Sequence, residues 1–339
     1  MRPKKRRVKE RERRGSSNAG GPKTVCFRTD RIGDMVLTMP AMARLAANSG
    51  GGRVTVVASP RTRELLDGQP WVEDVIEAES IVPGLAAKLR AGGFRRAVFF
   101  FPRPGLAFSA FRAGIRERVG TAYRWYSFLF NRRAKVHRRE NVRHEAEYNM
   151  DILAALGIDP DYGAPLIPPV ITPADENRAR VALAAAGVKT GWIAVHPGSL
   201  GSALNASPEW FGRLAAELEF AGMPVMFTGI PAEKALVEKA VAVAGLSMGR
   251  FVAPPGLKVL GALLKMSAGF VGPSTGPLHV AASLGIPVVG IYPRVHSQSP
   301  VRWGPRGLKC ASVRAPDAGM DALDPREVVA ALRGKMGGK

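Results

Sequence analysis

Two aspartates, Asp30 and Asp34, lie four residues apart in the segment RTDRIGDMVLTMP, residues 28–40. The segment follows the apolar run KTVCF and leads into an apolar-periodic stretch, a pattern typical of a strand that turns into a helix. A carboxylate within hydrogen-bond reach of a hydroxyl can remove its proton as a general base. An aspartate is also a common starting residue of a helix, so the two residues by themselves leave both interpretations open.

A second candidate segment follows the apolar strand WIAV. It contains His196, Gly198 and Ser199 in a loop ahead of a helix that we expect to start at Ser207 and Pro208. Glycine lets the backbone approach a ligand closely, and free N–H groups in such a loop suit phosphate oxygens. An ordinary strand-to-helix loop is the alternative interpretation.

A third segment, FVGPSTGPLHVAASLGIPVVGIYP, is more specific. A strand ends at Pro273, and Ser274, Thr275 and Gly276 then start a helix that carries His279. The N-terminus of a helix binds anions through its free N–H groups and its dipole, so a diphosphate suits this position, although His279 could also be purely structural. The chain has no P-loop sequence and no GxGxxG after its first strand, which disfavours a P-loop enzyme and a dinucleotide-binding dehydrogenase.

Hydrophobic periodicity predicts the elements that position these segments. Strands alternate with helices in two series, near 23–29, 53–59, 72–78 and 95–101, and then near 191–197, 224–229, 250–254, 268–273 and 286–293. The proline-rich stretch APLIPPVITPADE indicates a boundary near 165–175. We therefore expect an α/β protein with two doubly wound, Rossmann-like domains that face each other across a cleft, with chemistry at the carboxyl ends of the strands.

Positive charge is concentrated in two stretches. The 339 residues include 49 Lys and Arg against 28 Asp and Glu, a formal net charge of +21. Residues 1–23 hold ten basic and two acidic side chains and few apolar ones, the composition of a disordered tail. Residues 103–143 hold eleven basic and two acidic side chains interleaved with seven aromatic ones. This stretch suits an acidic glycolipid at a membrane surface, single-stranded nucleic acid, or core aromatics with solvated arginines.

Two absences in the sequence bear on location. The chain has no apolar run of about 18 residues and no hydrophobic signal core after its basic start. We therefore expect a cytoplasmic protein, with a peripheral position at the inner membrane as a further hypothesis. Cys26 and Cys310 lie far apart and have neither metal-ligand nor disulfide spacing, which fits a reducing compartment.

Four motifs in their order and spacing resemble glycosyltransferase family 9, the ADP-heptose:lipopolysaccharide heptosyltransferases. They are RTDRIGDMVLTMPAMARLA, VHPGS, FTGIPAEK and GPSTGPLHVAASLGIPVVGIY, and the resemblance covers about residues 24–310. It implies a GT-B fold whose C-terminal domain holds the sugar nucleotide and whose N-terminal domain binds the acceptor. It also implies an inverting transfer with no bound metal and no cofactor, in agreement with the lack of metal-ligand spacing in the sequence.

The resemblance assigns roles to individual residues. Asp34 matches the general base of the family, with Asp30 as the rival that could instead pair with Arg28 or Arg31. The positions that match the donor site are His196, Gly198, Ser199, Thr228, Gly229, Glu233, Ser274, Thr275, Gly276 and His279. The candidates for binding the acceptor come instead from the first motif and the basic stretch 103–143, and they are Arg31, Arg124, Arg132, Arg133, Arg138 and Arg143.

Two positions depart from the family pattern. Ser274 replaces the acid that begins the donor loop, which removes a negative charge beside a diphosphate. Leu204 or Asn205 stands where family members carry a basic residue that would neutralise the leaving diphosphate. Arg31, or a basic residue from 103–143, is the expected substitute.

The sequence thus predicts a monomeric glycosyltransferase that moves a heptose from ADP-heptose onto a lipopolysaccharide-core or related cell-envelope glycolipid, at the inner face of the cytoplasmic membrane and without a nucleic-acid partner. The expected organisation is a basic tail over 1–23, an acceptor-binding domain over 24–170, a nucleotide-sugar-binding domain over 171–315, and a C-terminal helix and tail over 316–339. Three alternatives stay open: a catalytically altered family member, a sugar-nucleotide epimerase or hydrolase on the same fold, and a basic nucleic-acid-binding protein.

Overall fold

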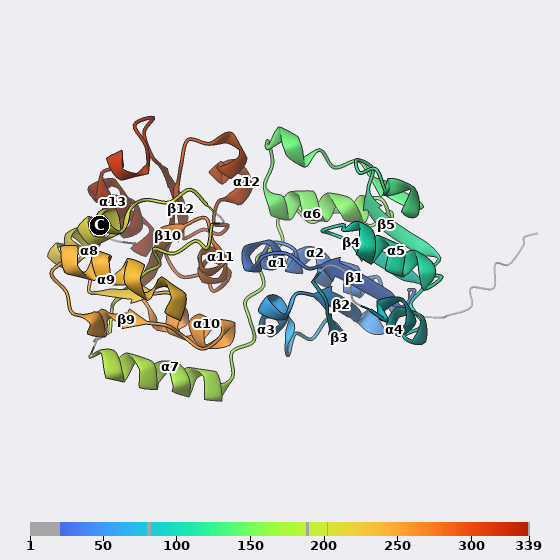
Figure 1. The fold of residues 1–339 in the computed structure, drawn as a ribbon, viewed down its shortest axis with the longest axis horizontal. Coiled ribbons are helices and arrows are strands. Elements are labelled where there is room, and N and C mark those ends of the chain that lie inside the picture. Colours follow the sequence, from blue (N-terminus) through green and yellow to red (C-terminus); the bar gives the residue numbers. More distant parts are fainter. Residues whose placement is uncertain (1–20, 80–82, 188–189, 202, 338–339) are drawn as a thin grey trace, which may run out of the picture.

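The computed structural model describes residues 21–79, 83–187, 190–201 and 203–337. The chain forms two lobes, one from its first half and one from its second, joined by an extended segment that crosses between them (Figure 1). Nearly all of the tail expected over 1–23 lies outside the described residues, so its conformation stays a prediction. Within the described part, no helix is both long and apolar enough to cross a membrane.

The first lobe contains a six-stranded parallel sheet with the order β3-β2-β1-β4-β5-β6. Its strands are β1 (Thr24–Arg28), β2 (Val54–Ala58), β3 (Val72–Glu77), β4 (Arg96–Phe99), β5 (Glu117–Thr121) and β6 (Arg132–Ala134). The helices of this lobe are α1 (Ile32–Val36), α2 (Met39–Ala47), α3 (Arg63–Leu66), α4 (Leu85–Ala91), α5 (Pro104–Arg112) and α6 (Glu145–Ala154).

The second lobe repeats this topology with the order β12-β11-β10-β7-β8-β9, again all parallel. Its strands are β7 (Ile193–Val195), β8 (Val225–Thr228), β9 (Phe251–Val252), β10 (Gly269–Pro273), β11 (Val288–Tyr292) and β12 (Cys310–Arg314). Its helices are α7 (Pro173–Ala186), α8 (Pro208–Phe220), α9 (Lys234–Val243), α10 (Leu257–Met266), α11 (Gly276–Ser283), α12 (Pro300–Trp303) and α13 (Pro325–Met336). The expected cap of α8 is present, since Oγ of Ser207 accepts the N–H of Trp210 at 3.1 Å.

In both sheets the strand order reverses between the first and the fourth strand of the series, at β1 and β4 and at β7 and β10. Open parallel sheets bind ligands just beyond the carboxyl ends of their strands at such a switch point. The loops after β1 and β4 and those after β7 and β10 are therefore the ones that the topology places for chemistry.

The expected strands and the two-sheet α/β class are confirmed, but the basic stretch 103–143 also contains two strands, although none was expected between the two predicted series. Residues 117–121 and 132–134 form β5 and β6, and β12 was also missed. These strands lie toward the sheet edges and carry charge in place of an apolar run. Glu117 of β5 pairs with Arg96 at 2.6 Å and with Arg132 at 3.5 Å, so cross-strand ion pairs hold β5 between its neighbours.

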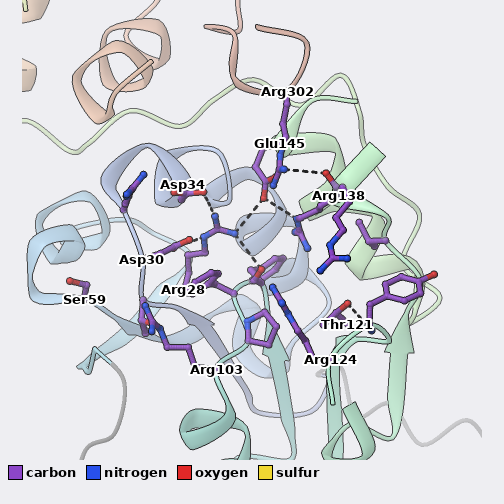
Figure 2. Close-up of a pocket in the computed structure, with 18 of the residues that line it drawn as sticks. Arg28, Asp30, Asp34, Ser59, Arg103, Thr121, Arg124, Arg138, Glu145 and Arg302 are labelled. Atoms are coloured by element: carbon purple, nitrogen blue, oxygen red, sulfur yellow. Dashed lines mark hydrogen bonds and ion pairs between the residues drawn. The ribbon is translucent and has the colours of Figure 1, made fainter. Parts of the chain in front are cut away.

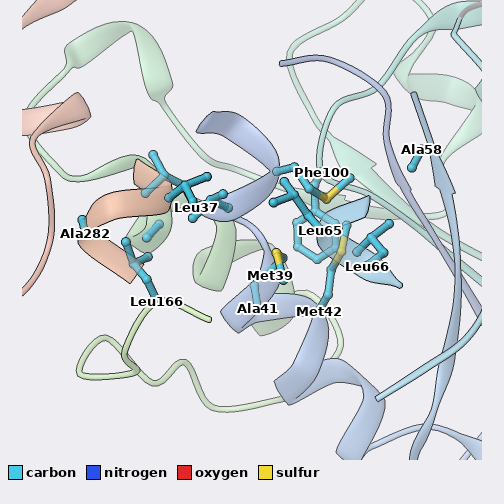
Figure 3. Close-up of a cluster of buried hydrophobic side chains, with 14 of the residues drawn as sticks. Leu37, Met39, Ala41, Met42, Ala58, Leu65, Leu66, Phe100, Leu166 and Ala282 are labelled. Carbon is cyan, nitrogen blue, oxygen red and sulfur yellow. The ribbon is translucent and has the colours of Figure 1, made fainter. Parts of the chain in front are cut away.

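The largest cluster of buried apolar side chains continues from the first lobe into the second. Around α2 and α3 it contains Met39, Met42 and Leu65, all fully buried, and it extends to Leu166 in the connecting segment and Ala282 on α11 (Figure 3). Burial of such side chains is the main source of folding free energy. Because the cluster is continuous, part of that free energy holds the two lobes together.

The lobes also meet where α1 packs against α11. A Cβ on Gly33 would lie 2.7 Å from Cδ2 of His279, and a Cβ on Gly276 would lie 2.6 Å from Cβ of Ile32. Gly33 lies inside α1 and is not among the glycines with positive φ, so a tight turn is not what requires glycine there. Both glycines are needed for the close approach of the two helices.

Replacing Gly33 with Ala should weaken the contact between the lobes. The new Cβ would collide with the buried imidazole of His279, and relief of such overpacking costs about 1–3 kcal/mol. The free energy of unfolding in urea measures the effect. Gly334→Ala on α13 is the matched control, because nothing lies within 4 Å of a Cβ at that position, and it should keep or raise stability by up to about 1 kcal/mol. Equal losses in the two variants would contradict the close-approach explanation.

Candidate active site

Two cavities meet at the loop after β1. The first, here called the arginine cavity, has a volume of about 990 Å³ and is lined mainly by the first lobe, with Arg302 and Trp303 from the second. The second, called the interlobe cavity, has a volume of about 590 Å³ and is lined by both lobes. The residues that line both cavities are Asp30, Arg31, Asp34, Arg61 and Trp303.

The guanidinium of Arg28 organises the junction. Its side chain is 2% exposed, its Nε lies 2.7 Å from Oδ1 of Asp30, and its Nη2 pairs with Oδ1 of Asp34. Its Nη1 donates to the carbonyl oxygen of Phe100 at 3.3 Å and lies 3.7 Å from Oε1 of Glu145 (Figure 2). The expected pairing of Asp30 with Arg28 is present, but Asp34 shares the same cation, so both candidate bases are fixed by one side chain.

Glu145 is a second centre of charge that the sequence reasoning missed. It is the first residue of α6 and is 1% exposed, and its carboxylate lies 3.1 Å from Nε of Arg138 and 2.8 Å from Nη2 of Arg302. Arg302 belongs to α12 in the second lobe, and Nε2 of the neighbouring His144 lies 2.9 Å from the carbonyl oxygen of Gly304. These contacts join α6 to α12 at the wall of the arginine cavity, which Glu145 and Arg302 both line (Figure 2). A glutamate at a helix start is common, so the sequence offered no signal for this role.

Burial and shared charge set the protonation of these carboxylates. Burial raises the pKa of Asp30 to about 7. The positive charge of Arg28 opposes this rise, and the negative charge of Asp34 adds to it. Burial also raises the pKa of Asp34, again against Arg28. At Glu145 burial acts in the same direction, but Arg138, Arg28 and Arg302 outweigh it and lower the pKa below the usual range. Arg28 cannot neutralise two carboxylates, so the aspartate pair retains a proton near neutral pH.

Most of the expected donor residues line the interlobe cavity. They are His196, Gly198 and Ser199 after β7, Gly229 and Glu233 after β8, and Ser274, Thr275, Gly276 and His279 around the start of α11. Thr228 does not line it: the side chain is fully buried, and its Oγ1 lies 3.1 Å from Nδ1 of His196. Thr228 therefore supports His196 from behind.

Glu233 and Gly198 fit tightly against each other. Oε2 of Glu233 accepts the N–H of Ile230 at 3.0 Å, and a Cβ on Gly198 would lie 1.8 Å from Oε1 of Glu233. The glycine thus leaves room for a carboxylate whose orientation the N–H fixes. This places an oriented acceptor group on the wall of the interlobe cavity.

The two cavity histidines are neutral. Burial lowers the pKa of His196 to about 4 and that of His279 to about 3. Neither can supply positive charge to an anion at neutral pH. Among the described residues that line the interlobe cavity, the arginines are Arg31 and Arg61, both from the first lobe, and the start of α11 adds its free N–H groups.

The six expected acceptor residues divide into two groups. Arg31, Arg124 and Arg138 line the arginine cavity, although Arg138 is occupied by Glu145. The other three lie outside both cavities: Arg132 pairs with Glu117, Arg133 donates to the carbonyl oxygen of Phe130, and Arg143 pairs with Asp151 at 2.8 Å. Four lining arginines were not singled out, namely Arg61, Arg103, Arg139 and Arg302.

The loop at Leu204 is tied to the segment before α12. The Leu204 N–H donates to Oε1 of Gln298 at 2.8 Å, and its side chain is exposed. Asn205 donates from its side chain to the carbonyl oxygen of Pro197. Neither residue supplies a cation, so positive charge near the interlobe cavity comes from across the interface.

Comparison with known proteins identifies the family. The model of glycosyltransferase family 9 (heptosyltransferase) matches residues 95–322, two thirds of the chain. The chain belongs to glycosyltransferase family 9. A Haemophilus influenzae protein described as a glycosyltransferase, with no donor or acceptor named, is 28% identical over 298 residues, which are 84% of this chain and 86% of that protein.

Solved structures share the fold of this glycosyltransferase. A family 9 glycosyltransferase from Veillonella parvula superposes with a TM-score of 0.79 at 17% identity, over 93% of this chain and 97% of that one. The E. coli ADP-heptose LPS heptosyltransferase II superposes with a TM-score of 0.77 at 19% identity, over 93% and 98%. The expected GT-B class is thereby confirmed. The family match begins at residue 95, after Asp34, so the role of Asp34 stays a prediction.

Glu145→Gln should destabilise the glycosyltransferase strongly. Arg28, Arg138 and Arg302 would lose their common carboxylate. Removing one partner of a buried ion pair lowers the free energy of unfolding by about 3–5 kcal/mol. The matched control is Glu147→Gln on the same helix, since that carboxylate is 28% exposed and pairs with Arg143 at 3.4 Å. The control should change the free energy of unfolding by no more than about 1 kcal/mol. Urea unfolding of both variants measures the difference, and equal effects would contradict the importance of Glu145.

Proposed function

We propose that this glycosyltransferase moves a heptose from ADP-heptose onto an acidic cell-envelope glycolipid, with inversion at the anomeric carbon and with Asp34 as the general base. The observation that carries the proposal is that Asp34 lies where the interlobe cavity and the arginine cavity join. Two substrates that enter from opposite sides would meet at this carboxylate. Neither an epimerase nor a hydrolase of a sugar nucleotide needs a second large cavity.

The donor fits the interlobe cavity. Its diphosphate would lie at the start of α11, an eight-residue helix whose first two residues, Gly276 and Pro277, line the cavity together with Ser274 and Thr275. The nucleoside would extend toward Ile230, Glu233 and Leu257, where apolar and oriented polar groups alternate. ADP-heptose is the named substrate of the E. coli heptosyltransferase that shares this fold, which supports the choice of donor.

The acceptor fits the arginine cavity. Eight arginines and four carboxylates line it, and Arg61, Arg103 and Arg124 have no ion-pair partner among the described residues. Guanidinium groups bind carboxylates and phosphates in two-point contacts. The family resemblance supports a lipopolysaccharide-core glycolipid as the acceptor. We propose that acidic groups on its oligosaccharide bind these arginines and that its acceptor hydroxyl then points toward Asp34.

The transfer follows from these positions. The acceptor oxygen forms a bond to the anomeric carbon as the bond from that carbon to the diphosphate breaks, and the hydroxyl proton goes to a free carboxylate oxygen of Asp34. Attack from the face opposite the leaving group inverts the configuration. Arg28 holds Asp34 in place, while Arg31 and Arg61 at the junction offset the charge that develops on the diphosphate, in the role of the basic residue absent at Leu204.

Asp34→Asn should bind the donor and lose transfer. The amide has the same shape but cannot accept the proton, so we expect the rate to fall by about 10²- to 10⁴-fold. Thermal melting of both proteins with ADP-heptose measures binding, and transfer to a lipopolysaccharide-core acceptor measures catalysis.

Three outcomes would contradict the proposal. Transfer by Asp34→Asn at the normal rate would exclude Asp34 as the base. Release of free sugar without acceptor would favour a hydrolase. A lack of any melting shift across ADP-, GDP-, UDP- and TDP-sugars, with folding intact, would exclude a nucleotide-sugar enzyme.

The pH profile should report the aspartate pair. A base acts only when it is deprotonated, and burial raises the pKa of Asp34 above its usual value, so kcat/KM should fall about tenfold per pH unit on an acid limb that lies at higher pH than an ordinary aspartate would give. In Asp30→Asn, Asp34 is the only aspartate that faces Arg28, so the pKa of Asp34 should decrease. The acid limb of the kcat/KM profile should then move to lower pH by about one unit. An acid limb that does not move would show that another group titrates.

A further inference from the structure

Four phenylalanine and tryptophan side chains are exposed on the described part of the first lobe. Phe108 and Phe111 of α5 are 49% and 50% exposed, Trp125 is 79% exposed, and Phe128 is 66% exposed. We call this group the aromatic rim. Large aromatic side chains are usually at least partly buried, so a cluster of exposed ones marks a surface that binds something apolar.

The rim is one surface. Phe108 and Phe111 lie one helical turn apart with ring centroids 6.5 Å from each other. The guanidinium of Arg118 lies over the Phe111 ring at 5.3 Å, and its Nε donates to the carbonyl oxygen of Leu129 at 2.7 Å. Leu129 ends the short 3-10 helix Ser127–Leu129, which packs on α5 and contains Phe128. Thus α5 and the loop that carries Trp125 and Phe128 are held together.

Positive charge surrounds the rim. The basic residues there that have no carboxylate partner among the described residues are Arg112, Arg116, Arg118, Arg124, Arg133, Lys135 and Arg139. Of the two acids of the stretch, Glu117 pairs with Arg96 and Arg132, and Glu140 is exposed and lies 3.9 Å from Nδ1 of His137, so neither pairs with these seven side chains. The surface therefore presents apolar rings within unneutralised positive charge.

The rim adjoins the arginine cavity directly. Tyr123 and Arg124 line that cavity, and Trp125 is the next residue along the chain. The Trp125 ring packs edge-on against Tyr126 at 5.3 Å, and Oη of Tyr126 donates to the carbonyl oxygen of Pro102, which also lines the cavity. A molecule bound on the rim would therefore lie beside the cavity mouth.

We propose that the aromatic rim docks on the surface of an anionic phospholipid bilayer. Tryptophan and phenylalanine insert at the boundary of head groups and acyl chains, and arginines bind lipid phosphates around them. The inference rests on the proposed function in one respect: a glycolipid acceptor has its lipid in that bilayer and its sugar outside it, so docking beside the cavity brings the sugar to the site. Single-stranded nucleic acid would need rings along a groove for base stacking, whereas these rings project from a helix and a loop.

The test uses the full chain and vesicles of phosphatidylethanolamine and phosphatidylglycerol, with phosphatidylcholine vesicles for comparison. Co-sedimentation should show binding to the anionic vesicles that weakens with salt. Trp125→Ser with Phe128→Ser should weaken vesicle partitioning at least about tenfold, equivalent to about 1.4 kcal/mol. Phe220→Ser is the matched control, because Phe220 is 92% exposed but lies at the end of α8 in the second lobe, and it should bind as the unchanged protein does.

Tryptophan fluorescence separates the rim from the basic stretch at residues 1–23. Trp125 is 79% exposed, whereas Trp71, Trp192 and Trp210 are buried and Trp303 is partly buried in the cavity wall, so a blue shift on vesicle binding should come mainly from Trp125. Trp125→Phe should lose that shift and keep binding. Unchanged partitioning of the double Ser variant, or vesicle binding without a blue shift, would assign binding elsewhere and overturn the proposal.

Two further measurements keep this result independent of the proposed function. Transfer to a delipidated core oligosaccharide should be the same in the double Ser variant and the unchanged protein, since the rim contacts lipid alone. Tight binding of single-stranded oligonucleotide that the double Ser variant loses, without vesicle binding, would overturn the docking proposal in favour of nucleic acid. Failure of sugar transfer with vesicle binding intact would count against the proposed function and leave the docking surface in place.

Discussion

A single buried guanidinium, that of Arg28, connects the groups on which the site depends. It faces Asp30, Asp34 and Glu145, and it is also anchored to the backbone at Phe100 after β4. A buried cation of this kind is stable only with carboxylates around it, and those carboxylates are in turn oriented by it. The loops after β1 and β4 and the start of α6 are thus fixed relative to one another by charge.

The same network reaches the second lobe. Glu145 binds Arg302 of α12, while the glycine contact between α1 and α11 brings His279 against Gly33. Asp34 therefore lies between two interlobe contacts, one ionic and one steric. A relative movement of the lobes would change the distance from Asp34 to the start of α11, so the proposed base and the proposed diphosphate site are coupled by the architecture.

Charge is distributed unequally between the two cavities. The interlobe cavity has neutral histidines and obtains its arginines from the first lobe, whereas the arginine cavity has twice as many arginines as carboxylates. Under the proposed mechanism, this gives the acceptor side a strong attraction for acidic sugars. On the donor side, Arg31 and Arg61 complete the positive charge only when the two lobes are together.

Local patterns in the sequence were enough for the α/β class, the paired series of parallel strands and the family resemblance, and nine of the ten expected donor residues line the interlobe cavity. These patterns are apolar periodicity and the loops that directly follow strands such as β7 and β10. The sequence did not reveal Glu145, Arg302 or the sharing of Arg28, and three of its acceptor arginines lie outside both cavities. These features depend on the three-dimensional arrangement, because an ion pair between residues 145 and 302 forms only where the two lobes meet. No local pattern records which arginines pair with a carboxylate and which remain free to bind a ligand.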